Sequence, residues 1–478
     1  MPWGLFLDAS GAVMLFNSSI YIFLFLPFSV VIYFLLIRYR MILAGKSWLV
    51  LASLFFYGYW NPIYLPLIVG SMLVNYGIGT VLSRPPTSGR HPASPKLVLA
   101  LAITLNLALL GYYKYADFFL SNLNALAGTD FPALRLVLPL AISFFTFQQI
   151  AYLVDSYQGQ TQEYDFLNYC LFVTFFPQLI AGPIVHHREM MPQFERLRSK
   201  VLNYRNLATG IFIFSVGLFK KVVIADTFAV WATLGFDTLP ELSFLGAWTA
   251  SLSYALQLYF DFSGYTDMAI GSALMLNLNL PLNFSSPYKA LNLQDFWRCW
   301  HMTLSRWLRD YLYIPLGGNK KGPGRVYVNL FMTFLLGGLW HGAGWTFVLW
   351  GAMHGGGTAL HKWWQGRGIG MPKWLAWLLT FSFVNFSWVF FRAKSFDDAM
   401  KVFSGMTGTH GFSLPDGMPD ASVGLVIAML AVAALGKNSM ELKERFRPNL
   451  YWLIFVLTAL AVSLFSMERV SEFLYFQF

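Results

Sequence analysis

Long apolar segments recur along the chain from Ile20 to its last residues, without a polar gap large enough for a soluble domain. A helix that crosses a bilayer needs about 20 apolar residues, so the pattern predicts about eleven to fourteen spans. They lie near 20–37, 48–82 (two, broken at Asn61-Pro62), 97–113, 134–154, 165–185, 206–225, 243–260, 264–280, 326–340, 343–361, 374–391, 421–436 and 449–466. We therefore predict an all-α polytopic membrane protein with about eleven or more transmembrane helices plus re-entrant and interfacial helices, forming one transmembrane domain over residues 1–478.

Two features of this pattern bear on its topology. The 165–185 segment contains Pro177 and Pro183, so a re-entrant path is an alternative to a full crossing. The first nineteen residues carry no Lys or Arg, while the loop after the first span carries three: Arg38, Arg40 and Lys46. Because basic loops stay in the cytoplasm, we expect the N-terminus outside, on the opposite side of the membrane from this loop.

The composition agrees with a membrane protein. Hydrophobic residues make up 56% of the 478 residues and charged residues only 12%, against about a quarter in soluble domains. The net charge of +10 resides in short loops between apolar runs, which indicates contact with anionic lipid headgroups and no nucleic-acid partner. Two cysteines, Cys170 and Cys299, are too few for a disulfide framework or a cysteine-based zinc site, so no metal site is predicted.

Residues 291–315 are too charged to span a bilayer but show a helical period. An amphipathic interfacial helix results, with Asp295 near its start, three arginines on one face, and the other face formed by Trp297, Trp300, His301, Leu304, Trp307, Leu308 and Tyr311. His301 lies in the aromatic stripe, so its imidazole should point inward and needs a polar partner. A core histidine bonded to a carbonyl is the alternative to a catalytic role.

A second histidine, His341, lies between Gly337-Gly338 and Gly342-Gly344 inside a long apolar region. Such glycines weaken a helix, and an ionisable residue at a break within a membrane indicates a functional site. A buried neutral imidazole suits a general base for acyl transfer to an alcohol. Alternatively, the glycines only permit close helix packing. His354, thirteen residues later, cannot share a face with His341 on a continuous helix, and we interpret it as structural.

Two carboxylates, Asp261 and Asp267, also lie in an apolar region. They either orient a histidine or substrate, or cap a helix around Ser263-Gly264. The chain has neither a G-x-x-x-x-G-K-[ST] phosphate loop nor a G-x-S-x-G nucleophile elbow.

Five motifs resemble those of the membrane-bound O-acyltransferase superfamily: PQLIAGPI (177–184), DFSGYTDMAIG (261–271), NFSSPY (283–288), DFWRCWHMTLSRWLRDYLYIPLGG (295–318) and GGLWHGAGWTFVLWGAMHG (337–355). More narrowly, these motifs resemble those of the bacterial branch that contains the alginate O-acetyltransferase membrane component and the D-alanyl transfer protein of teichoic acids. It implies a ring of helices around a thin centre, where a cytoplasmic funnel and an outward funnel form a central tunnel. It also implies that His341 is catalytic and that His301 is a second active-site residue.

The resemblance further implies a reaction. The acyl donor is expected to be acetyl-CoA, with no resident cofactor, and the acceptor a periplasmic acetyltransferase or an exopolysaccharide such as alginate. D-alanyl transfer and acylation of a lipid are alternatives within the superfamily. A transporter is the alternative from another class, although the internal repeats of many carriers are not visible in the sequence.

Several further residues are candidates for substrate binding. Arg306 and Arg309, near Lys320 and Lys321, either bind CoA phosphates or act as positive-inside anchors. The tryptophans either wall the tunnel and exclude water or pack as ordinary aromatic residues: Trp297, Trp300, Trp340 and Trp345. From their motifs we also expect Asp267 and Asn283 at the substrate.

The two ends of the chain carry separate predictions. The resemblance implies that relatives begin at the equivalent of Met14, so residues 1–13 are interpreted as an extension or a misplaced start. Residues 471–478 resemble the aromatic tail of alginate-type members, which is thought to engage partners; an interfacial anchor is the alternative.

Overall fold

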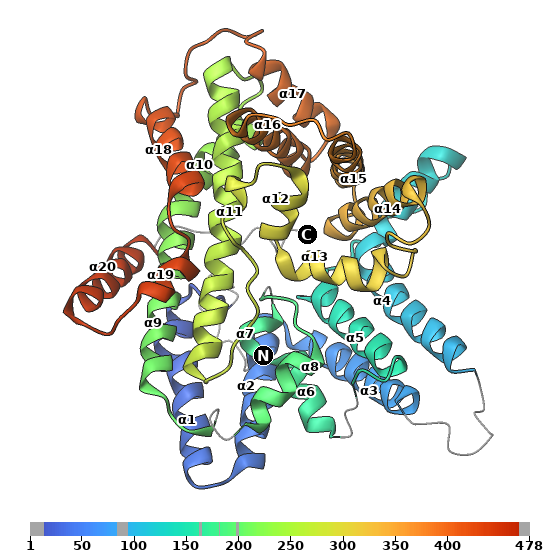
Figure 1. Ribbon diagram of the computed structural model, residues 1–478, viewed down its shortest axis with the longest axis vertical. Helices are drawn as coiled ribbons and strands as arrows, with labels where there is room; N and C mark the ends of the chain where they lie inside the picture. The colour runs from blue at the N-terminus through green and yellow to red at the C-terminus, as the bar shows by residue number, and fades with distance from the viewer. Residues whose placement is uncertain (1–13, 84–93, 162–164, 181, 197–199, 468–478) are drawn as a thin grey trace. The chain divides into compact units, whose positions relative to one another are not determined.

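The computed structural model describes residues 14–83, 94–161, 165–180, 182–196 and 200–467. Within these ranges the secondary structure is entirely helical, which confirms the predicted class (Figure 1). The predictions for residues 1–13 and 471–478 lie outside the described residues. Backbone packing divides the chain into two compact units. A single functional domain over the whole chain stays a prediction.

The first unit contains the residues up to Phe214 together with Met268–Pro281. Its helices are η1 (Tyr21–Phe25), α1 (Leu26–Arg38), α2 (Ile42–Trp60), η2 (Pro62–Tyr64), α3 (Leu65–Leu82), α4 (Pro95–Ala127), α5 (Ile142–Tyr157), α6 (Phe166–Thr174), α7 (Phe176–Leu179), α8 (His187–Glu195) and most of α9 (Tyr204–Phe219). The break predicted at Asn61-Pro62 is confirmed, because α2 ends at Trp60 and the Asn61 side chain accepts a hydrogen bond from the backbone N–H of Ile63.

The second unit contains Ser215–Asp267 and the residues from Leu282 onward. Helix α11 (Phe244–Met275) lies mainly in this unit and ends in the first. The other helices are η4 (Lys220–Ala225), α10 (Asp226–Thr233), η5 (Leu234–Thr238), η6 (Pro287–Lys289), α12 (Leu293–Cys299), α13 (Met302–Leu308), η7 (Arg309–Tyr313), α14 (Pro323–His341), α15 (Trp345–Gly366), α16 (Lys373–Arg392), α17 (Phe396–Met406), α18 (Ala421–Leu435), α19 (Ser439–Arg445) and α20 (Leu450–Ser466).

Six continuous helical stretches among the described residues are long and apolar enough to cross a bilayer: Tyr21–Arg38, Ile42–Trp60, Pro62–Leu82, Pro95–Ala127, Tyr204–Thr238 and Lys373–Arg392. A seventh arises if α18 and α19, which meet at an angle of 59°, form one broken span. The number is smaller than the eleven or more that we expected. The other predicted spans form helices that are too short or too polar to meet these criteria. The six helices that do meet them make the chain a polytopic membrane protein.

Two predicted spans, 243–260 and 264–280, are wrong as separate elements. The continuous helix α11 runs through both for 32 residues. Gly264 lies inside this helix without breaking it. Its lack of a side chain allows close packing against Gly217, because a Cβ atom at Gly264 would lie 2.7 Å from the carbonyl oxygen of Gly217. A helix cap around Ser263-Gly264 is therefore excluded for Asp261 and Asp267, which both lie within α11.

The 165–185 segment is not one membrane-crossing helix. It holds the nine-residue α6 and the four-residue α7, separated at Phe175. Nine residues of helix extend about 14 Å, less than half of the hydrocarbon thickness. The expected interruption of this segment is thus confirmed. The 134–154 span is also shortened at its start, since α5 begins at Ile142.

Helices α14 and α15 lie side by side in the second unit (Figure 1). A Cβ atom at Gly338 would lie 2.7 Å from the Cα atom of Gly351, and one at Gly351 would lie 2.6 Å from the carbonyl oxygen of Phe334. The two backbones therefore touch directly. Close approach of this kind requires small residues, so Gly338 does serve helix packing.

Candidate active site

His341 is the last residue of α14 and is buried. Gly342 follows in an extended conformation, and α15 begins only at Trp345, so the predicted break at the glycines is confirmed. Packing and interruption of the helix are thus both present at this position. The C-terminal end of a helix carries partial negative charge, which stabilises an imidazolium that forms there when a histidine accepts a proton.

One tryptophan, Trp340, contacts both histidines predicted for the active site. Its ring centroid lies 4.9 Å from that of His341 and 6.5 Å from that of His301. His341 also packs edge to face against Trp350, with ring centroids 5.0 Å apart, and against Phe391 at 5.2 Å. The structure therefore brings His301 and His341 into one aromatic cluster. Their catalytic roles stay predictions.

The helix predicted for residues 291–315 is not continuous. Helix α12 ends at Cys299, α13 begins at Met302, and His301 between them has a left-handed backbone with φ +42°. The prediction of one continuous amphipathic helix was therefore wrong. Asp295 does lie in the first turn of α12, as expected. A left-handed conformation is unfavourable for a residue other than glycine, and such strain concentrates at functional sites.

His301 is fully buried, as predicted, and its partner is Asn283. The Nδ1 atom of His301 lies 3.1 Å from the Oδ1 atom of Asn283. The same oxygen accepts hydrogen bonds from the backbone N–H and the hydroxyl of Thr303, at 3.2 and 2.9 Å. Burial lowers the pKa of His301 to about 3, so its imidazole is neutral. Asn283, predicted to bind substrate, here holds a histidine.

His354 is also fully buried and has two side-chain partners. Its Nδ1 atom lies 3.2 Å from the indole nitrogen of Trp297, and its Nε2 atom lies 2.9 Å from the hydroxyl of Ser387. These contacts support the structural interpretation of His354. Its ring also lies 4.7 Å from that of Trp350, which contacts His341 as well. The two histidines, on either side of the break between α14 and α15, therefore contact the same tryptophan.

The tryptophans predicted to wall a tunnel differ in exposure. Trp297, Trp300 and Trp340 are buried, whereas Trp345 is 56% exposed. A wall position inside the protein is therefore wrong for Trp345. The ring of Trp300 packs 5.0 Å from that of Trp388, which places it in the same aromatic cluster.

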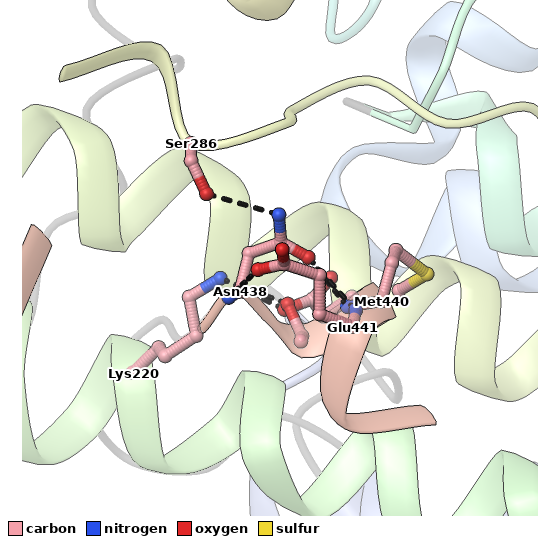
Figure 2. A network of polar contacts seen from close by, with 7 residues as sticks. Lys220, Ser286, Asn438, Met440 and Glu441 are labelled. Atoms are coloured by element: carbon pink, nitrogen blue, oxygen red, sulfur yellow. Dashed lines mark hydrogen bonds and ion pairs between the residues drawn. The ribbon is translucent and has the colours of Figure 1, made fainter. Parts of the chain in front are cut away.

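The carboxylate of Asp267 is occupied by protein groups. Its Oδ2 atom lies 2.8 Å from the ammonium of Lys220 and accepts a hydrogen bond of 2.5 Å from Ser439, in the first turn of α19. Figure 2 shows Lys220 at this turn, next to Asn438 and Glu441. Asn438 caps α19 in a reciprocal arrangement with Glu441 and also donates to the Ser286 hydroxyl at 2.9 Å. A substrate contact for Asp267 stays a prediction.

A second buried ion pair joins Lys221 to Asp261 at 2.7 Å and to Asp226 at 2.8 Å. Sequence analysis missed both lysines. Two adjacent lysines inside an apolar segment were the available signal, because a charge at membrane depth must be paired and α11 offers two carboxylates. Both aspartates of α11 are thus held in ion pairs with these lysines.

The candidate phosphate-binding residues lie near the surface. The Arg309 side chain is 62% exposed and lies 2.7 Å from Asp310, and this hydrogen bond raises the pKa of the guanidinium. Arg306 is half-buried. Contact of either with CoA stays a prediction. Among the described residues, no group of three or more His, Cys, Asp or Glu side chains is placed to hold a metal ion.

Comparisons with known proteins identify the family of this chain. Residues 133–396, which contain His301 and His341, match the model of MBOAT, the membrane-bound O-acyltransferase family. The chain is 53% identical over 432 residues to the peptidoglycan O-acetyltransferase of Helicobacter pylori, covering 84% of this chain and 81% of that protein. It is 37% identical to the probable alginate O-acetylase AlgI of Pseudomonas putida, covering 97% of this chain and 100% of the relative.

A more distant relative shows the breadth of the similarity. The teichoic acid D-alanyltransferase of Bacillus subtilis is 29% identical over 281 residues, which cover 55% of this chain and 71% of that protein. The family match extends over more than half of the chain and includes His301, His341 and His354. This chain therefore belongs to the membrane-bound O-acyltransferase family and is an O-acyltransferase.

Proposed function

We propose that this enzyme is an O-acetyltransferase of the bacterial cell envelope. It takes an acetyl group from acetyl-CoA on the cytoplasmic side of the inner membrane and delivers it, directly or through a periplasmic acetyltransferase, to a hydroxyl of an envelope glycan. The observation that carries this proposal is the pair of buried histidines that share Trp340 at the end of α14. Relatives named as O-acetyltransferases support the acetyl group as cargo.

The chemistry asks for a neutral base in a site that excludes water. The oxygen of the accepting hydroxyl attacks the thioester carbonyl, a new C–O bond forms, the C–S bond breaks, and the hydroxyl proton passes to an imidazole and then to the CoA sulfur. We assign proton acceptance to His341, with His301 assisting. The helix end at His341 stabilises the imidazolium, and the surrounding aromatic rings protect the thioester from hydrolysis.

Peptidoglycan is the acceptor that the comparisons favour. The identity of 53% to a protein named as a peptidoglycan O-acetyltransferase exceeds the 37% to an alginate O-acetylase. An exopolysaccharide such as alginate is the second candidate, because that likeness extends over 97% of the chain. D-alanyl transfer is less supported, since its relative matches 55% of the chain.

Purified protein incubated with acetyl-CoA tests the reaction. Wild type should release free CoA, slowly by hydrolysis and faster with an acceptor, while His341→Ala should lose about 10²- to 10⁴-fold in rate. The matched control is His410→Ala, which removes an imidazole that lies exposed in a loop. Equal CoA release by wild type and His341→Ala would contradict the proposal. Uptake of labelled substrate without CoA release would indicate a transporter.

Cells test the acceptor. In a strain that lacks this gene, base-labile acetate should disappear from purified peptidoglycan and return with the wild-type gene but not with His341→Ala. Loss of acetate from a secreted polysaccharide alone would identify the exopolysaccharide as acceptor. Loss of ester-linked D-alanine from the envelope would exclude acetyl as the cargo.

We also propose an inner-membrane location with the N-terminus in the periplasm. The charge difference between the first nineteen residues and the loop holding Arg38 and Arg40 supports this orientation. A periplasm-active reporter fused to the N-terminus should be active, and the same reporter inserted in the Arg38–Arg40 loop should be silent. The reverse pattern would overturn the orientation.

A further inference from the structure

We propose that Asn283 is a positioning residue that holds His301 in the Nδ1–H tautomer, which makes Nε2 the proton-accepting atom of this histidine. The inference rests on the proposed function, in which His301 assists acetyl transfer. It replaces the substrate contact that the sequence suggested for Asn283 with a contact to a catalytic histidine.

The amide orientation of Asn283 follows from its neighbours. A backbone N–H can only donate, and that of Thr303 lies 3.2 Å from the Asn283 atom that faces it. This atom must therefore be the carbonyl oxygen Oδ1. The Thr303 hydroxyl donates to the same oxygen at 2.9 Å. Among the described residues, the Nδ2 group of Asn283 has no hydrogen-bond partner, so Oδ1 alone holds this side chain to its neighbours.

The tautomer of His301 follows from the identity of that oxygen. A carbonyl oxygen accepts hydrogen bonds and cannot donate them, so the Nδ1 atom of His301 at 3.1 Å must carry the proton. A neutral imidazole has one N–H, which leaves Nε2 with the lone pair. Burial keeps the ring neutral, because charging it would cost desolvation energy.

The backbone holds Asn283 in place for this contact. The N–H of Met302 donates to the carbonyl of Asn283 at 2.9 Å, and the N–H of Ser285 donates to the carbonyl of Cys299 at 2.9 Å. The left-handed conformation of His301 forms the turn between these two bonds. These two backbone hydrogen bonds join Asn283 and Ser285 to the turn and therefore fix the distance between the amide and the imidazole.

The far end of the same segment is anchored to α19. Asn438 donates to the Ser286 hydroxyl at 2.9 Å, as Figure 2 shows, and the ammonium of Lys289 donates to the carbonyl of Gly436 at 2.6 Å. Segment 283–289 is thus held on one side by the His301 turn and on the other by the α18–α19 bend. Such support is needed to keep a catalytic side chain within a fraction of an ångström of its working position.

His354 provides a comparison within the same cluster, because its tautomer is the opposite one. The Trp297 indole can only donate, so Nδ1 of His354 accepts. Its proton is on Nε2 and is donated to Ser387, whose hydroxyl donates in turn to the carbonyl of Val384 at 2.7 Å. Both nitrogens of His354 are used in structural bonds, whereas Asn283 directs the lone pair of His301 to Nε2.

Three variants separate positioning from substrate binding. Asn283→Ala removes the acceptor and should lower kcat by about 10²-fold with little change in KM, since a misoriented base loses its contribution. Asn283→Asp keeps an oxygen in the same place and should retain kcat within about tenfold. Thr303→Val, the matched control, removes the hydroxyl contact with the same oxygen but leaves the His301 bond, and should lose less than about tenfold.

The tautomer itself is measured by nitrogen NMR on protein labelled with ¹⁵N-histidine, with the His301 signals assigned by their loss in His301→Gln. Protonated and unprotonated ring nitrogens resonate at well separated shifts. Wild type and Asn283→Asp should show His301 protonated at Nδ1 only, and Asn283→Ala should show a mixture of tautomers.

Three results would overturn the inference: Nε2–H as the wild-type tautomer of His301, a rise in KM with unchanged kcat in Asn283→Ala, or equal losses in the Ala and Asp variants. The wild-type spectrum needs only His301→Gln for its assignment, so poor folding of Asn283→Ala leaves the test intact. It also needs no turnover. Absence of CoA release from wild type would therefore sink the proposed function while the spectrum still tests the tautomer.

Discussion

The indole N–H of Trp297 donates a hydrogen bond to Nδ1 of His354 across 3.2 Å, which joins α12 to α15. The two residues lie 57 positions apart in the chain. Trp297 and Trp350 both pack on the ring of His354, and Trp350 also packs on the ring of His341. The hydrogen bond therefore helps to hold in place the aromatic rings next to His341. Its loss should therefore affect both stability and catalysis.

His354→Ala should lower the free energy of unfolding by about 2–4 kcal/mol, because it leaves a cavity and a buried indole N–H without an acceptor. His354→Gln, which keeps an acceptor, should lose less. Denaturant unfolding in detergent, followed by tryptophan fluorescence, measures both. If Trp297→Phe and His354→Ala prove additive when combined, the hydrogen bond between these side chains does not contribute.

The buried pair of Lys220 and Asp267 predicts a non-additive effect. Lys220→Met alone leaves the Asp267 carboxylate buried without its ammonium partner, and should cost about 3–5 kcal/mol of unfolding free energy. The double variant Lys220→Met/Asp267→Leu should be more stable than Lys220→Met. Thermal unfolding of the three proteins under one detergent condition is the measurement, and a double variant that is the least stable of them would refute the pairing.

Alanine substitutions at two glycines of α15, Gly351 and Gly356, should have different effects on activity. Gly351→Ala places a methyl group 2.6 Å from the carbonyl oxygen of Phe334, so α14 and α15 must separate and His341 at the end of α14 must shift. Turnover should fall at least about tenfold, since sub-ångström displacement of a base is costly. Gly356→Ala is the matched control on the same helix, because a Cβ atom there meets nothing within 4 Å.

In the control, alanine should preserve activity and raise stability by up to about 1 kcal/mol, as expected for replacing glycine within a helix. Assays of CoA release and unfolding on both variants decide the point. Equal activity of Gly351→Ala and Gly356→Ala would show that the contact between the two helices does not position His341.

The pKa of His301 predicts how stability depends on pH. Burial lowers this pKa from 6.5 to about 3, so below about pH 6.5 the unfolded chain binds a proton at this position that the folded protein does not. Protonation of His301 in the unfolded chain therefore does not reduce the free energy of unfolding above about pH 6.5. Below that pH the free energy of unfolding falls progressively as the pH approaches 3.

Wild type should therefore lose about 1.4 kcal/mol per pH unit more than His301→Gln between about pH 6 and about pH 4. Parallel stability curves for the two proteins over this range would show that the folded state does protonate His301. Unfolding in denaturant at several pH values, with both proteins in the same detergent, provides the comparison.

The amino-acid sequence by itself determined the class of this protein and where its chemistry is concentrated. Repeated apolar runs with few charges require a membrane environment, whatever the tertiary packing. His341 could be singled out because burying an ionisable residue in a membrane costs free energy, and because the glycines that flank it are adjacent in the sequence. His301 could be singled out because it lies within an aromatic stripe, although the helix that displayed this stripe proved to be broken.

Only the tertiary structure decided which groups meet. Asp267 pairs with Lys220, 47 residues away, and with Ser439, 172 residues away, and no local pattern encodes these distances. The tautomer of His301 depends on the amide of Asn283, 18 residues earlier, whose orientation is set in turn by Thr303. Hydrophobic periodicity reports whether a side chain is buried, whereas hydrogen bonds and ion pairs depend on the positions of atoms that only the folded chain brings together.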